Sequence, residues 1–147
     1  EITTRLVGSE MCIRDRINTV DEGLEFCKEI DSPNCKLLLD CFHMNIEEDD
    51  IEQSIEKAAD HIGYFHVSEP NRKVPNTCVH INWKAIGKAL KKTGYDGAVV
   101  LEPFYKFGGE QGHNMRMWRD LDKDLSMENR LRIAEQGIEY IKTQFEE

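Results

Sequence analysis

The segment Asp96-Gly-Ala-Val-Val-Leu-Glu102 carries an apolar run that ends on a single carboxylate. A turn-forming Asp-Gly pair precedes four apolar residues, a pattern typical of a short strand buried on both faces, as in a parallel sheet. A carboxylate directly after such a strand lies at its carboxyl end, where α/β enzymes hold their chemical groups. The segment therefore predicts a strand at 97–102 that delivers Glu102 to a functional edge.

The same design occurs twice more in the chain. The run Lys36-Leu-Leu-Leu-Asp40 ends on Asp40, and the run Ile62-Gly-Tyr-Phe-His66 ends on His66. Because parallel strands end at one edge of a sheet, we expect Asp40, His66 and Glu102 to lie close together. A mixed oxygen and nitrogen set favours Mn²⁺, Co²⁺ or Mg²⁺ with open positions over a closed zinc site of cysteine and histidine.

Composition excludes several classes of protein. The chain has 147 residues, 39% hydrophobic and 32% charged, with a net charge of -9. No apolar run is long enough to span a bilayer, and the acidic balance argues against nucleic-acid binding. The five cysteines are odd in number and form no C-x-x-C pair, which indicates reduced thiols in a cytoplasmic protein and argues against a structural zinc site.

Helical and extended patterns alternate along the chain. Strands are expected at 36–40, 62–66 and 97–102, and helices at about 20–30, 47–59, 83–93 and 127–145. Alternation at this spacing predicts an α/β fold with parallel strands and right-handed crossovers. A complete (β/α)8 barrel needs about 250 residues, so we expect the carboxyl-terminal half of a TIM barrel. The stripe expected to be buried on the last helix is Leu131, Ala134, Ile138 and Ile141.

Residues 1–16 fit no element that precedes or follows them. They resemble translated sequencing-adapter read-through, and we interpret them as a foreign leader without function. The alternative is a genuine irregular leader. On either interpretation, the half-barrel domain is expected to occupy residues 17–147.

His43, Glu69 and Arg72 follow the strand-end residues closely and are further site candidates. An arginine offers a fork of donors for sugar oxygens, and a nearby carboxylate can orient it. Each candidate also has a simpler interpretation. Asp40 can cap a loop that packs His43, and Glu69 with Arg72 can form a surface salt bridge. For Glu102, the alternative is a buried acid paired with Arg116 or Arg119.

Four segments carry a resemblance to a known family. They are LLLDCFHMNIEE (37–48), GYFHVSEPNR (63–72) followed by Val74-Pro75, VLEPF (100–104) and WRDL (118–121). These segments resemble the ketose 3-epimerases, which act on D-tagatose, D-psicose (allulose) or L-ribulose and belong to the sugar phosphate isomerase/epimerase barrels. The resemblance covers about residues 17–147 and stays in register through separate motifs.

The resemblance implies Asp40, His66 and Glu102 as ligands of a divalent metal ion, Mn²⁺ or Co²⁺, with Mg²⁺ as a further option. It implies His43 and Arg72 as contacts of a small ketose substrate and Glu102 as an acid/base catalyst. Glu69 is added to the substrate-binding residues because a carboxylate at this position can orient His66 or Arg72. The implied reaction is epimerisation at C3 through an enediolate. The full-length enzyme is expected to be a homo-oligomer.

One implied group has no clear counterpart in the chain. The family's second acid/base carboxylate, also its fourth ligand, lies on the preceding strand, which we expect to be missing or replaced by residues 5–16. Glu1 and Glu10 are weak substitutes, because neither ends an apolar strand. We therefore expect a fragment that is incomplete for catalysis.

Other functions fit the same pattern less well. A hydroxypyruvate isomerase or an inosose dehydratase would keep the barrel and the metal. A metal-dependent barrel endonuclease is disfavoured by the acidic charge and the few histidines. Outside the enzymes, the alternative is a non-catalytic half-barrel module whose open strand edges bind a partner.

Overall fold

The computed structural model describes residues 17–146, except residues 79, 107 and 115–116. Three strands, β1 (Leu37–Asp40), β2 (Ile62–Val67) and β3 (Val99–Leu101), form one parallel sheet in the order β1-β2-β3. The predicted α/β architecture with parallel strands is confirmed. The foreign leader expected at 1–16 lies outside the described residues.

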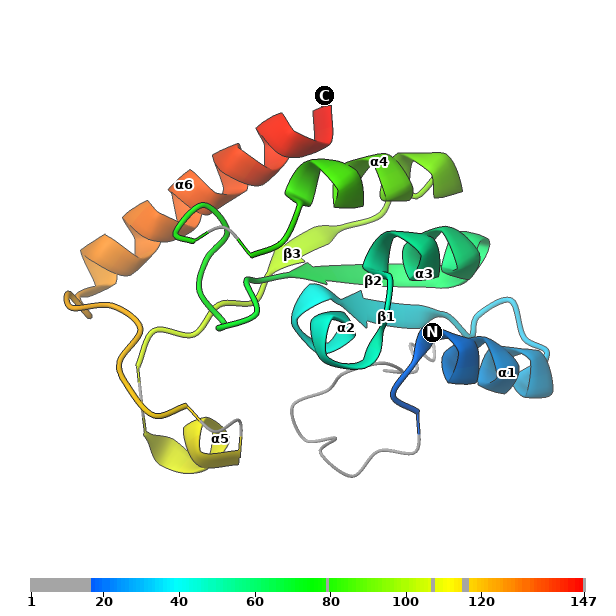
Figure 1. Ribbon diagram of the computed structural model, residues 1–147, viewed down its shortest axis with the longest axis horizontal. Helices are drawn as coiled ribbons and strands as arrows, with labels where there is room; N and C mark the ends of the chain where they lie inside the picture. The colour runs from blue at the N-terminus through cyan, green and yellow to red at the C-terminus, as the bar shows by residue number, and fades with distance from the viewer. Residues whose placement is uncertain (1–16, 79, 107, 115–116, 147) are drawn as a thin grey trace.

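Four helices pack along the sheet. They are α1 (Val20–Ile30), α3 (Ile51–Ala58), α4 (Trp83–Thr93) and α6 (Met127–Glu146). Figure 1 shows α6, α4, α3 and α1 following one another beside the strands, and successive helices in this row contact each other. None of the helices in the described part of the chain is long and apolar enough to cross a membrane.

Polar side chains at the helix ends set the observed boundaries. These boundaries match the predicted ones for α1 and α4, but the helix expected at 47–59 begins only at Ile51, directly after its cap Asp50. Thr19 begins α1 with a capping box, and Asp50 and Asn82 cap α3 and α4 by accepting backbone N–H groups. Gly94 ends α4 in the left-handed region with φ 73°. Glycine takes this conformation without a Cβ clash, which is why the helix ends at this residue.

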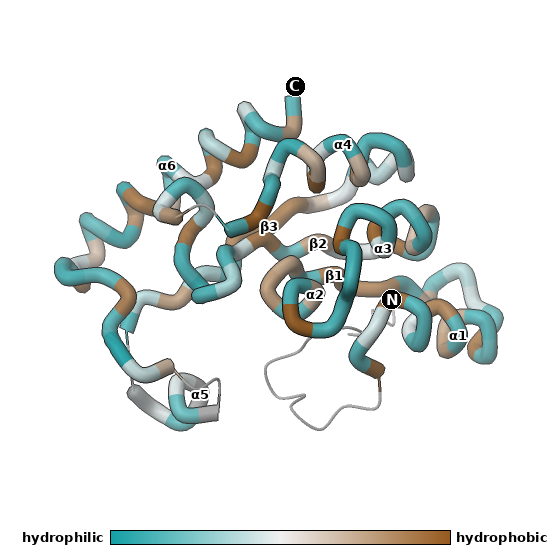
Figure 2. The backbone as a smooth tube through the Cα atoms, in the orientation of Figure 1, coloured by the Kyte–Doolittle hydropathy of each residue, from teal (hydrophilic) through white to brown (hydrophobic). Residues whose placement is uncertain are grey.

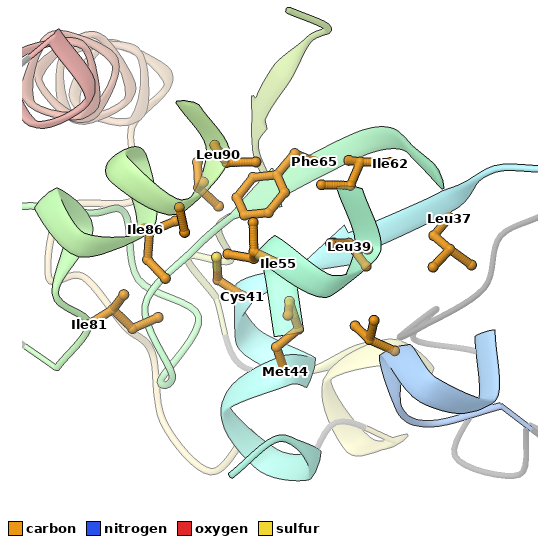
Figure 3. Packing of buried hydrophobic residues seen from close by; sticks show 14 of the residues in the cluster. Leu37, Leu39, Cys41, Met44, Ile55, Ile62, Phe65, Ile81, Ile86 and Leu90 are labelled. Carbon is orange, nitrogen blue, oxygen red and sulfur yellow. The ribbon is translucent and has the colours of Figure 1, made fainter. Parts of the chain in front are cut away.

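The core lies between the sheet and the helices. Phe65 of β2 is fully buried, and Figure 3 shows its ring among Ile55 of α3 and Ile86 and Leu90 of α4. Figure 2 shows the hydrophobic colour concentrated on the strands and on the helix faces that turn toward them. Alternate strand residues point to opposite faces, so the face opposite Phe65 carries the even-numbered residues. These are Leu38, Asp40, Tyr64 and His66.

Two burial predictions are wrong. The strand at 97–102 is not buried on both faces, since Val99 is 37% exposed. Among the strands of the described residues, β3 pairs with β2 alone, so its other edge is left uncovered. In α6 the buried face is Asn129, Ile133, Gly137 and Ile141. Leu131 and Ile138 from the predicted stripe are exposed. The helix is rotated because Gly137 lies against Val74, where no larger residue fits.

Two short helices were not predicted. The first, α2 (Cys41–Glu47), follows β1 directly, and the second, α5 (Gly109–Asn114), lies in the segment expected to be a loop. Figure 1 shows α5 well away from the sheet. The α5 helix contains two glycines and no apolar side chain, so hydrophobic periodicity could not predict it. In α2 the signal is present, because Asp40 is a good N-cap.

Replacing Gly87 with alanine is expected to lower the free energy of unfolding by about 1–3 kcal/mol. A Cβ at this position would lie 2.9 Å from the Phe145 Cα atom and 2.8 Å from its Cδ1 atom, so α4 and α6 would have to separate. Urea denaturation measures the loss. Lys88→Ala, an exposed change on the same helix, is the control and should cost less than about 0.5 kcal/mol. Equal midpoints for the two variants would contradict this close packing.

Candidate metal centre and substrate site

The parallel register brings the three strand-end residues together. Asp40 is the register partner of His66, and His66 is the partner of Val100. Glu102 comes directly after β3, and its N–H donates to the Val67 carbonyl at 3.2 Å. One ligand atom each from Asp40, His66 and Glu102 lies within 4.8 Å of the other two. We call these three residues the strand-end cluster.

His66 lies close enough to both carboxylates of the strand-end cluster to interact with them. His66 Nδ1 lies 3.2 Å from Glu102 Oε2 and 4.0 Å from Asp40 Oδ2. The Asp40 side chain is fully buried, whereas that of Glu102 is 26% exposed. Glu102 is therefore the carboxylate that a bound molecule can reach, and Asp40 lies beneath it.

Arg72 balances the negative charge of the strand-end cluster. Its Nη1 donates to Asp40 Oδ2 at 3.2 Å and to Glu102 Oε2 at 3.0 Å. The guanidinium lies 3.8 Å from the centre of the Phe42 ring and 5.4 Å from that of Phe104. Both rings are within cation–π range. Arg72 is 1% exposed, which excludes the surface salt bridge that was the alternative for this residue.

The two carboxylates have opposite pKa shifts. Burial raises the pKa of Asp40 to about 7, against the opposing effect of the Arg72 charge and with further upward contributions from Glu102. Burial also acts upward on Glu102, but hydrogen bonds with His66 and Asp40 and the nearby positive charges outweigh it and lower its pKa to about 2. Near neutral pH, Glu102 is therefore ionised, whereas Asp40 keeps its proton to a higher pH than an ordinary aspartate does.

His43 enters the site from α2. Asp40 begins this helix by accepting a hydrogen bond from the Phe42 N–H at 2.8 Å. Asp40 therefore has a capping role, as the alternative interpretation expected, although it caps a helix and not a loop. It has this role in addition to its place in the strand-end cluster. Arg72 Nη2 lies 3.0 Å from His43 Nε2. A guanidinium only donates, so this nitrogen accepts. Burial and the Arg72 charge lower the pKa of His43 to about 4, which keeps the ring neutral.

The structure does not bring Glu69 to the strand-end cluster. Its fully buried carboxylate accepts from Trp83 Nε1 at 2.8 Å and from the His80 N–H at 3.4 Å. The ion-pair partner of Glu102 is also a different arginine from the two considered in the sequence analysis. Arg119 is exposed and Arg116 lies outside the described residues, whereas Arg72 pairs with Glu102.

The donors of the strand-end cluster fit a divalent cation. Two carboxylates and one imidazole offer oxygen and nitrogen atoms, the set that Mn²⁺, Co²⁺ and Mg²⁺ accept in open sites. Asp40 keeps a raised pKa despite Arg72, so its buried charge is only partly compensated. A cation among the three ligand atoms would complete that compensation. These residues can therefore hold a metal ion.

The class of protein follows from comparison with known families. The model of the xylose isomerase-like TIM barrel family matches residues 7–144, and the chain belongs to this family. The match includes part of the segment interpreted above as a foreign leader. The three parallel strands with their helices are one part of such a barrel.

Two similar proteins with known names are sugar epimerases. The chain is 44% identical over 124 residues to the D-psicose 3-epimerase of Ruminiclostridium cellulolyticum, covering 84% of this chain and 42% of the relative. It is 32% identical over 131 residues to the L-ribulose 3-epimerase of a Methylomonas species, covering 88% of this chain and 44% of the relative. The chain thus spans less than half the length of these curated relatives.

A solved structure agrees. A D-psicose 3-epimerase from Clostridium cellulolyticum H10, crystallised with D-tagatose, superposes with a TM-score of 0.88 at 38% identity, covering 97% of this chain and 48% of that one. The family resemblance inferred from the four motifs is confirmed, as is the expectation of a partial barrel.

Sequence reasoning missed the aromatic groups around Arg72. Phe42 and Phe104 belong to quoted motifs, but nothing in their spacing indicates that both rings flank one guanidinium. The available signal was the position of each phenylalanine, two residues after a strand-end carboxylate. Two parallel strands ending at one edge bring such residues to the same place.

Proposed function

We propose that this chain supplies part of the active site of an enzyme that epimerises a free ketose at C3. The observation that carries the proposal is the strand-end cluster of Asp40, His66 and Glu102 beside the Arg72 guanidinium. The named relatives, which are ketose 3-epimerases, support it.

Asp40, His66 and Glu102 would hold a divalent ion, with Mn²⁺ or Co²⁺ preferred and Mg²⁺ as a further option. When bound, such an ion supplies Lewis-acid polarisation of the ketose carbonyl at C2. The proton on C3 is then acidic enough for a carboxylate to remove.

Glu102 is the residue suited to take that proton. It is ionised, partly exposed and held by His66 and Arg72. Loss of the C3 proton gives an enediolate, whose negative charge Arg72 can stabilise by donating hydrogen bonds. Neutral His43 can exchange a hydrogen bond with a sugar hydroxyl. Glu69 accepts hydrogen bonds from Trp83 and His80 and lies away from the strand-end cluster. It would therefore support the loop that carries Arg72 and would not contact the sugar directly.

Inversion at C3 needs a second carboxylate on the opposite face of the enediolate. Among the described residues, the strand-end cluster contains only two carboxylates, those of Asp40 and Glu102. Asp40 is fully buried beneath Glu102 and would serve as a metal ligand. Glu1 and Glu10, the weak sequence candidates, lie outside the described residues. A complete catalytic cycle is therefore proposed for a whole barrel that contains this chain.

A chimera tests the proposal. Residues 17–147 would replace the aligned segment of the Ruminiclostridium cellulolyticum D-psicose 3-epimerase, and folding would be checked by circular dichroism. With Mn²⁺ added, the chimera is expected to convert D-fructose to D-psicose, measured by liquid chromatography. A folded chimera that acts on hydroxypyruvate but on neither D-fructose nor D-tagatose would instead support the isomerase alternative. A small-molecule substrate, cytoplasmic location and homo-oligomeric assembly stay predictions.

A further inference from the structure

Glu69 is a buried carboxylate outside the strand-end cluster. It is 0% exposed, and its two hydrogen-bond donors, the Trp83 indole and the His80 backbone N–H, are both neutral. None of the ion pairs found in the described part of the chain includes Glu69. Burying a carboxylate without a cation is costly, because neutral donors offset only part of the lost hydration.

Two further metal-binding side chains lie beside Glu69. One ligand atom each from Glu69, Cys78 and His80 lies within 4.8 Å of the other two. Cys78 is half-buried and His80 is exposed, so the group opens to solvent on one side. Both residues belong to the loop between β2 and α4, whereas Glu69 follows β2 closely. The group therefore joins the two ends of that loop.

The chemistry of this group differs from that of the strand-end cluster. A carboxylate, a thiolate and an imidazole form the donor set of a zinc site, whereas the strand-end cluster has no sulfur. Metal–ligand bonds of about 2.0–2.3 Å place tetrahedral ligands about 3.3–3.7 Å apart, so the loop would close by about 1 Å. The Trp83 N–H already orients the carboxylate, as outer hydrogen bonds do around metal ligands.

We propose that Glu69, Cys78 and His80 bind a Zn²⁺ ion at a second site, separate from the strand-end cluster, with a fourth position open to water. The ion supplies the positive charge that buried Glu69 lacks. It also ties the loop that carries Arg72 to the start of α4. The role is structural, and its test does not depend on the proposed epimerase activity.

Cobalt is the probe for this site, because a thiolate bound to Co²⁺ gives a charge-transfer band in the near ultraviolet. Titrating the 147-residue chain with Co²⁺, in a buffer that contains a phosphine reductant to keep the cysteines reduced, is expected to produce this band. Cys78→Ser is expected to abolish it, and His80→Ala to weaken Co²⁺ binding at least about tenfold. Because Cys78 is only half-buried and His80 is exposed, both variants should fold, which circular dichroism checks.

Two control variants separate this site from others. Asp40→Asn, which disables the strand-end cluster, should keep the sulfur band, so this test is independent of the proposed function. Cys12→Ser, which removes a cysteine outside the described residues, should keep it too. The proposal is overturned if no band appears, if the band persists in folded Cys78→Ser, or if Cys12→Ser removes it.

Discussion

Replacing Asp40 with asparagine is expected to abolish the thermal stabilisation that Mn²⁺ gives the chain, because Mn²⁺ prefers oxygen ligands and binds poorly at a site that contains a thiolate. A neutral amide is a poor ligand for a hard cation, but its oxygen can still cap α2 at the Phe42 N–H. A ligand at 100 times its Kd stabilises a folded protein by about 2.7 kcal/mol. In a chain of this size, that corresponds to an increase in Tm of about 5–10 °C.

Scanning fluorimetry with and without Mn²⁺ measures this effect. The pH should be about 8, because the pKa of Asp40 is raised to about 7 and its proton competes with the cation below that value. Asp60→Asn is the matched control, since the Asp60 side chain is 88% exposed and does not belong to the strand-end cluster. Equal Mn²⁺-induced shifts in Tm for the wild-type chain and for Asp40→Asn would contradict the strand-end cluster as a metal site.

Replacing Glu102 with glutamine is expected to lower kcat for D-fructose epimerisation by about 10²–10⁴-fold in the chimera. Glutamine keeps the shape of the side chain and a carbonyl oxygen but cannot accept the C3 proton. Because Glu102 is also a proposed ligand, the assay needs saturating Mn²⁺, so that the loss reflects proton transfer and not an empty site.

Two variants isolate the acid/base role of Glu102. Glu128→Gln makes the same chemical change at an exposed position on α6 and should leave kcat unchanged. Glu102→Asp keeps a carboxylate at a shorter reach and should retain more activity than Glu102→Gln. If Glu102→Gln stays within about twofold of the unsubstituted chimera, Glu102 is not the base.

The three strands could be predicted from the sequence because each is a compact apolar run with a polar end, and their parallel direction followed from the alternation with helices. Asp40, His66 and Glu102 were expected at one edge, and parallel pairing brings them within 4.8 Å. The burial of β3 could not be predicted this way. Its residues are as apolar as those of β2, but its exposure depends on how many neighbours the strand has.

The contacts around the strand ends were only partly predictable. Arg72 could be named as a candidate, but its simultaneous bonds to Asp40 and Glu102 depend on three separate segments. The same holds for Glu69, Cys78 and His80, which come together only because the loop before α4 folds back. Because the cysteines are scattered along the chain, the sequence argued against a structural zinc site made of cysteines. A mixed site with one cysteine leaves no recognisable spacing.

The position of deuterium in the product tests the central claim most directly. The folded chimera would act on D-fructose in D₂O with Mn²⁺, and the product would be examined by proton NMR. If Glu102 and its neighbours exchange the C3 proton through an enediolate, the D-psicose formed will carry deuterium at C3. D-psicose that keeps its original hydrogen at C3 would contradict the account.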